Sequence, residues 1–85
     1  MTIRTTIIST LGSVWEDFVE DSPLPDWTDE TVLLDTGMDS LAFAVVVTEL
    51  EDALGFDPFT ESAEPVYPET FGQFVSFYQE FSDAR

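Results

Sequence analysis

The segment LDTGMDSL, residues 34–41, decides the fold because it places a turn directly before a long apolar stretch without proline. Gly37 supplies the backbone freedom that a turn needs, and Asp39 is a good N-cap residue. The residues that follow, up to Leu54, are mostly compatible with a helix. Ser40 then lies in the first helical turn. Unpaired backbone N–H groups and the positive end of the helix dipole favour an anion there, which suits a hydroxyl that carries a phosphodiester.

Three other helices are predicted from apolar spacing, from proline positions and from a capping box formed by Thr70 with Gln73. Their ranges are Thr2–Glu20, Thr60–Glu64 and Thr70–Ser82. Pro65 ends the short third helix. No β-strand is predicted, so the fold class is all-α. We expect a small four-helix bundle with three long helices and one short one, forming a single domain over residues 1–85.

The apolar residues of these elements predict the core. On the first helix they are Ile3, Ile7, Ile8, Leu11, Trp15, Phe18 and Val19, and on the second they are Phe43, Val46, Val47, Leu50 and Leu54. The last helix contributes Phe71, Phe74, Val75, Tyr78 and Phe81, with Phe77 beside them. The loop between the first two helices is long for a compact domain, so we expect a short helical turn within Thr28–Leu34. Trp27, Val32 and Leu33 should hold that loop against the core.

Composition excludes several classes of function. The chain has 85 residues, with 18 acidic against 2 basic ones and a formal charge of −16. This charge opposes binding to nucleic acid or to an anionic membrane surface and favours proteins with basic patches. The absence of Cys and His removes a thiol nucleophile, the commonest general base and the commonest zinc ligand. We therefore expect no catalysis and no intrinsic metal, and we take a monomer in the cytoplasm as the default.

The whole arrangement resembles the acyl carrier protein family. The resemblance covers nearly the full chain. Its specific part is the middle third, with the stretches 34–41 and 49–55. It implies that Ser40, which matches the serine of the family motif, carries a covalent 4′-phosphopantetheine. Asp39 matches the motif acid, which could help orient the hydroxyl or a divalent metal during modification. The resemblance also implies three partners, namely a phosphopantetheinyl transferase, an adenylating enzyme and a downstream acyltransferase or synthase.

The sequence departs from fatty-acid carriers on the second helix, where Val45 stands at a position that is typically acidic. Apolar residues next to the serine predict docking by hydrophobic contact, with acids only further along. The expected partner-binding residues are Leu41, Ala44, Val45, Thr48 and Asp52. The alternative is that the first half of this helix is more buried and packs against the loop.

Phe43 occupies volume that some carriers leave for a long acyl chain, so we predict a small or polar cargo in a specialised biosynthetic pathway. The chain then resembles the discrete acyl or aminoacyl carriers. Two alternatives stay open. One is an acyl carrier of primary fatty-acid synthesis, and the other is an unmodified acidic module that binds proteins through its charge. A calcium site at Asp35 and Asp39 is disfavoured because the ligand spacing of a calcium loop is missing.

Overall fold

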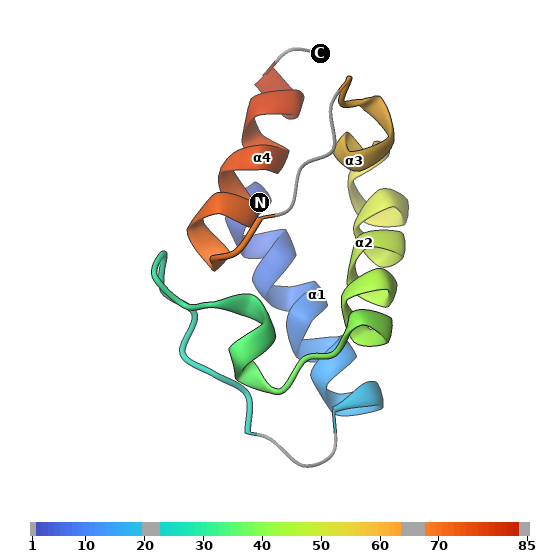
Figure 1. The fold of residues 1–85 in the computed structure, drawn as a ribbon. Helices are drawn as coiled ribbons and strands as arrows, with labels where there is room; N and C mark the ends of the chain where they lie inside the picture. Colours follow the sequence, from blue (N-terminus) through green and yellow to red (C-terminus); the bar gives the residue numbers. More distant parts are fainter. Residues whose placement is uncertain (1, 20–22, 64–67, 84–85) are drawn as a thin grey trace.

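The computed structural model describes residues 2–19, 23–63 and 68–83 and shows a small helical bundle (Figure 1). Its elements are α1 (Ile3–Phe18), the 3₁₀ helix η1 (Leu33–Thr36), α2 (Ser40–Leu54), α3 (Pro58–Glu61) and α4 (Phe71–Asp83). Helix α1 packs against both α2 and α4, and the short α3 packs against α4. The predicted all-α fold with three long helices and one short helix is confirmed. The described residues contain no strand, only an isolated bridge between Val32 and Thr70.

The helix boundaries follow local capping signals. Helix α4 begins with the predicted capping box, in which the Gln73 amide donates to the Thr70 hydroxyl at 3.2 Å and the Thr70 amide donates to Gln73 Oε1 at 3.3 Å. Helix α1 begins after the N-cap Thr2 and ends at Phe18, earlier than predicted. The predicted end of α1, Glu20, lies outside the described residues.

The prediction for α3 was wrong at its start. The helix begins at Pro58, and the Asp57 carboxylate accepts a hydrogen bond from the Phe59 amide at 2.9 Å. Proline is well suited to the first helical position because its missing N–H would have no partner there. Pro58 therefore starts this helix. The predicted end at Glu64 and the stop at Pro65 lie outside the described residues.

The core lies where α1, α2 and α4 meet. Its buried residues are Ile7, Leu11, Val14, Trp15, Leu33, Met38, Ala42, Val46, Leu50, Phe56, Phe71, Phe74, Val75 and Tyr78. Ile8 and Phe18 were predicted in the core but are 40% and 51% exposed, whereas Val14 is buried. The core stripe of α1 is thus narrower than its apolar content suggests. Phe43, Val47 and Leu54 on α2 are only partly buried and pack against this core.

The long loop is held to the core by side chains and by its backbone. Leu33 is buried, and Trp27 packs on Trp15 and on Phe71 with ring centroids 5.5 and 5.3 Å apart. Val32, in contrast, is 42% exposed, so the expectation that its side chain is pinned was wrong. Its backbone bridges Thr70 instead. The helical turn expected within Thr28–Leu34 occurs later, as η1.

Candidate functional site

Ser40 is the first residue of α2, and Asp39 caps the helix as predicted. The Asp39 carboxylate accepts a hydrogen bond from the Ala42 amide at 2.8 Å, and its backbone carbonyl accepts one from the Phe43 amide at 3.0 Å. The first bond pairs one of the amides that a helix start leaves without a partner, and the second is the first i→i−4 bond of α2. Among the described residues, the amides of Ser40 and Leu41 have no such partner.

Buried side chains on both sides fix the position of Ser40. Met38 and Ala42, two residues before and two after it, are each 2% exposed and belong to the core. Gly37 turns the chain with φ of 103°, a left-handed conformation that residues with a Cβ rarely adopt. Ser40 itself is exposed, and its hydroxyl makes no hydrogen bond with another described residue. The serine is thus held by its backbone while its oxygen faces solvent.

This arrangement fits a covalently attached phosphate diester. The oxygen is accessible, the two free amides lie at the same helix start, and the helix dipole is positive there. The carboxylate of Asp39 is occupied through Oδ1 by the Ala42 amide. The donor set of this site therefore suits an anionic group on the serine oxygen.

The apolar surroundings of Ser40 differ in part from the prediction. Leu41 is 67% exposed, and Ala44, Thr48 and Asp52 are also exposed. Val45, in contrast, is partly buried and packs against the core. Leu34, which the sequence did not mark as functional, lies in η1, six residues before Ser40 in the chain, and is 62% exposed. Apolar spacing gave no signal for the exposure of Leu34, because the side chain of either of two adjacent leucines can enter the core.

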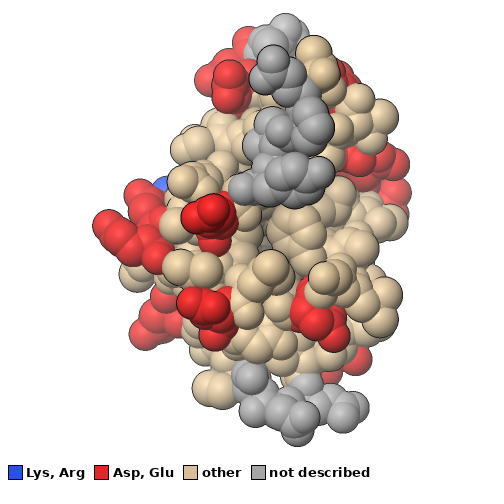
Figure 2. Space-filling model, in the orientation of Figure 1, with Lys and Arg blue, Asp and Glu red and all other residues tan. Residues whose placement is uncertain are grey.

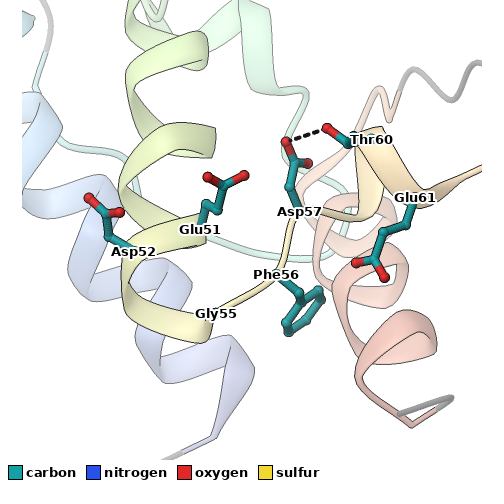
Figure 3. Close-up of a pocket in the computed structure, with 7 residues that line it drawn as sticks. All are labelled: Glu51, Asp52, Gly55, Phe56, Asp57, Thr60 and Glu61. Carbon is teal, nitrogen blue, oxygen red and sulfur yellow. Dashed lines mark hydrogen bonds between the residues drawn. The ribbon is translucent and has the colours of Figure 1, made fainter.

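The described residues also line an open groove at the other end of α2 (Figure 3). Its volume is about 460 Å³, and its lining residues are Glu51, Asp52, Gly55, Phe56, Asp57, Thr60 and Glu61. Ser40 and Glu51 are eleven residues apart, which corresponds to about 16 Å along the helix axis. The groove is therefore separate from the serine.

Acidic side chains are not confined to the groove. Figure 2 shows them spread over the visible face of the molecule.

Because the hydroxyl of Tyr78 is buried, we expect the free energy of unfolding to fall as the pH rises into the alkaline range. It has no hydrogen-bond partner among the described residues, and burial raises the pKa of Tyr78 far above its usual value, with the Asp57 and Glu51 carboxylates adding to the rise. Above about pH 10 the unfolded chain loses a proton that the folded chain keeps, so stability falls by up to about 1.4 kcal/mol per pH unit. Urea unfolding between pH 8 and 11.5 should show this decline.

Tyr78→Phe is the control for this pH effect. It should be at least as stable as the wild type at neutral pH, because it removes a buried polar group without a partner. Its stability should decline less above pH 10. Parallel curves for the two proteins would show that other groups cause the decline.

The fold and the site together define a small helical carrier-like domain with an accessible serine at the start of its second long helix. The comparison with protein families gives the same class. The family model described as "Phosphopantetheine attachment site" matches residues 4–61, more than half of the chain. The chain therefore belongs to the phosphopantetheine-binding family. No curated protein and no solved structure gives a significant match.

Membership confirms the resemblance to acyl carrier proteins seen in the sequence. Proteins of this family carry 4′-phosphopantetheine covalently on a serine. They interact with phosphopantetheinyl transferases and with synthase-type enzymes, and they are in general carriers without catalysis of their own. Among the described residues, no helix has the length and apolar character needed to span a membrane.

Proposed function

We propose that this chain carries an acyl or aminoacyl group on a 4′-phosphopantetheine arm attached to Ser40, and that it presents this group to partner enzymes. The observation that carries the proposal is the exposed hydroxyl of Ser40 at a helix start whose backbone is fixed by the buried Met38 and Ala42. The bound arm supplies a terminal thiol that holds the cargo as a thioester. This explains how a chain without Cys can serve as a thioester carrier.

The residues of the chain itself have limited roles in this function. Ser40 supplies the oxygen that attacks the phosphorus on the pantetheine side of the coenzyme A pyrophosphate. The P–O bond to the other phosphate breaks, 3′,5′-ADP leaves with the electron pair, and a base of the transferase takes the hydroxyl proton. Asp39 keeps the helix start in place and offers its carboxylate to a divalent metal during modification. A phosphopantetheinyl transferase performs the chemistry, an adenylating enzyme loads the cargo, and an acyltransferase or synthase consumes it.

The experiment is the intact mass of the purified chain before and after incubation with coenzyme A, magnesium and a broad-specificity phosphopantetheinyl transferase. A gain of one phosphopantetheine supports the carrier. An unchanged mass would favour the acidic interaction module. Subsequent loading of the thiol with a malonyl group would favour a carrier of fatty-acid synthesis over a specialised one.

The aromatic interior supports a small or polar cargo. Phe43 on α2 lies 5.4 Å from Phe74 on α4 between ring centroids, and 6.1 Å from Phe59 on α3. Phe59 in turn lies 4.9 Å from Phe77. Rings from three helices therefore meet between α2 and α4. Because protein interiors are close-packed, a long acyl chain would have to displace these rings to enter there.

Leu41 is the docking residue that we expect to matter most for modification, because it is the most exposed large apolar side chain beside Ser40. Leu41→Glu should raise KM for the transferase at least tenfold, since an apolar contact is replaced by a charge. Leu24→Glu is the matched control, because Leu24 is 54% exposed and lies in the loop. It should change KM less than twofold. Equal effects of the two variants would show that only the added charge matters.

A further inference from the structure

The loop before the site is fastened to the start of α4 by its backbone. We call residues 28–33 the strap. Three hydrogen bonds between main-chain atoms join the strap to the start of α4, the two segments that lie side by side in Figure 1. They run from Leu33 N–H to the Glu69 carbonyl (3.0 Å), from Phe71 N–H to the Thr31 carbonyl (2.8 Å) and from Gly72 N–H to the Asp29 carbonyl (3.1 Å). The strap thus satisfies two amides in the first turn of α4, which a helix cannot pair internally.

This close approach requires glycine at position 72. A Cβ atom there would lie 2.8 Å from the Asp29 Cβ and 3.0 Å from the Asp29 Cα and carbonyl oxygen. These are mainly backbone atoms that cannot rotate away, so any side chain pushes the strap off α4. Gly12 in α1 differs, because a Cβ there would meet nothing within 4 Å. The two helical glycines therefore form a matched pair, one in contact with the strap and one in open space.

Arg4 joins α1 to the same contact. Its guanidinium pairs with the Asp29 carboxylate at 2.7 Å and lies 5.4 Å from the centroid of the Phe71 ring. Both partners of the ion pair are more than 40% exposed, so the pair itself contributes little to stability. The chain has only two basic residues, Arg4 and Arg85, against 18 acids. Among the described residues Arg4 is the only basic side chain, and it joins α1 to the strap and to the Phe71 ring of α4.

The strap leads directly into the site. Its last residue, Leu33, is buried and begins η1, and the Thr36 hydroxyl donates a hydrogen bond back to the Leu33 carbonyl. Gly37 then turns the chain toward Ser40. When the strap is displaced from α4, η1 loses the anchor that precedes it in the chain. The exposed Leu34 and the rest of η1 then sample several orientations, although Met38 and Ala42 stay in the core.

We propose that Gly72 and Arg4 are positioning residues for the modification of Ser40, acting through the strap. The inference rests on the proposed function. Displacement of the strap from α4 lowers the fraction of molecules in which the site around Ser40 has the orientation that the transferase binds. The apparent affinity for the transferase then falls in proportion to that fraction. The rate from the bound state is unchanged. The expected signature is a higher KM with an unaltered kcat.

The experiment compares Gly72→Ala with Gly12→Ala in steady-state modification by the transferase with coenzyme A and magnesium. Gly72→Ala should raise KM at least fivefold and leave kcat within twofold of the wild type, while Gly12→Ala should change neither more than twofold. Far-UV circular dichroism verifies that each variant is folded at the assay temperature. In Gly72→Ala, hydrogen exchange of the Leu33 and Phe71 amides should quicken at least tenfold. An unchanged KM in folded Gly72→Ala overturns the inference, whatever happens to kcat.

If Gly72→Ala does not fold, Arg4→Gln decides. Arg85→Gln makes the same change in net charge and serves as its control. Arg4→Gln should raise KM at least twofold over Arg85→Gln, and equal KM values overturn the inference. A wild-type chain that gains no mass with the transferase overturns the proposed function itself, and the inference with it. Failure of the inference alone looks different, because the wild type is then modified and each variant has the same KM as its control.

Discussion

Replacing Ser40 by alanine is expected to abolish the mass gain with coenzyme A and transferase completely, while the protein stays folded. The hydroxyl is the only part removed, and it makes no hydrogen bond with another described residue. Ser40 is exposed at the start of α2, so the free energy of unfolding should change by no more than about 0.5 kcal/mol. Intact mass and urea unfolding of the same sample measure both effects. Residual modification of Ser40→Ala would place the attachment elsewhere.

Asp39→Asn is the companion variant, because it separates the two roles of this residue. Asparagine is as good an N-cap as aspartate, so the hydrogen bond to the Ala42 amide is retained and stability should stay nearly constant. The negative charge is lost. If the carboxylate helps to hold the divalent metal, modification should slow at least tenfold. A normal rate would leave Asp39 with capping as its only role.

Replacing Phe59 by alanine is expected to cost the fold about 2–4 kcal/mol, a large part of the stability of a small domain. Its ring is the centre of an aromatic cluster that fastens the one-turn helix α3 to the bundle. Ring centroids within 6.3 Å of it belong to Phe43, Phe74, Phe77 and Tyr78. Urea unfolding at pH 7 measures the loss.

Phe18→Ala is the control for Phe59, because the same ring is removed from a site that is 51% exposed. It should cost less than about 1 kcal/mol, since little packing is lost. Equal losses would mean that the aromatic cluster does not hold α3.

The aromatic cluster also bears on the size of the cargo. An octanoyl group should raise the melting temperature above that of the acetyl form in Phe59→Ala, where space is opened, and not in the wild type.

Local signals in the sequence predicted the starts of α2 and α4 and the turn before Ser40 well. The cap at Asp39, the turn at Gly37 and the capping box of Thr70 with Gln73 all occur as expected. Each of these depends on residues within about four positions of one another. Hydrogen bonds at a helix start are made within the first turn, so the sequence alone contains both partners. This is why the position of Ser40 on α2 could be predicted.

The direction in which each helix buries its side chains was predicted less well. Ala42 enters the core beside the predicted Val46 and Leu50, whereas Ile8 and Phe18 remain 40% and 51% exposed. Apolar spacing identifies a broad face, but the neighbouring helices select the part of it that is covered. For α2 this selection leaves Leu41 exposed and Val45 partly buried.

The sequence by itself determined the family, the four helices and the serine that starts α2. The tertiary structure alone decided the strap, because its contacts join residues about forty positions apart, such as Asp29 and Gly72. No periodicity or short motif shows that a glycine inside a helix faces a distant backbone. The same holds for Arg4, whose partners Asp29 and Phe71 become neighbours only when α1, the strap and α4 pack together. Contacts between segments far apart in sequence are fixed by packing, and packing exists only in the folded chain.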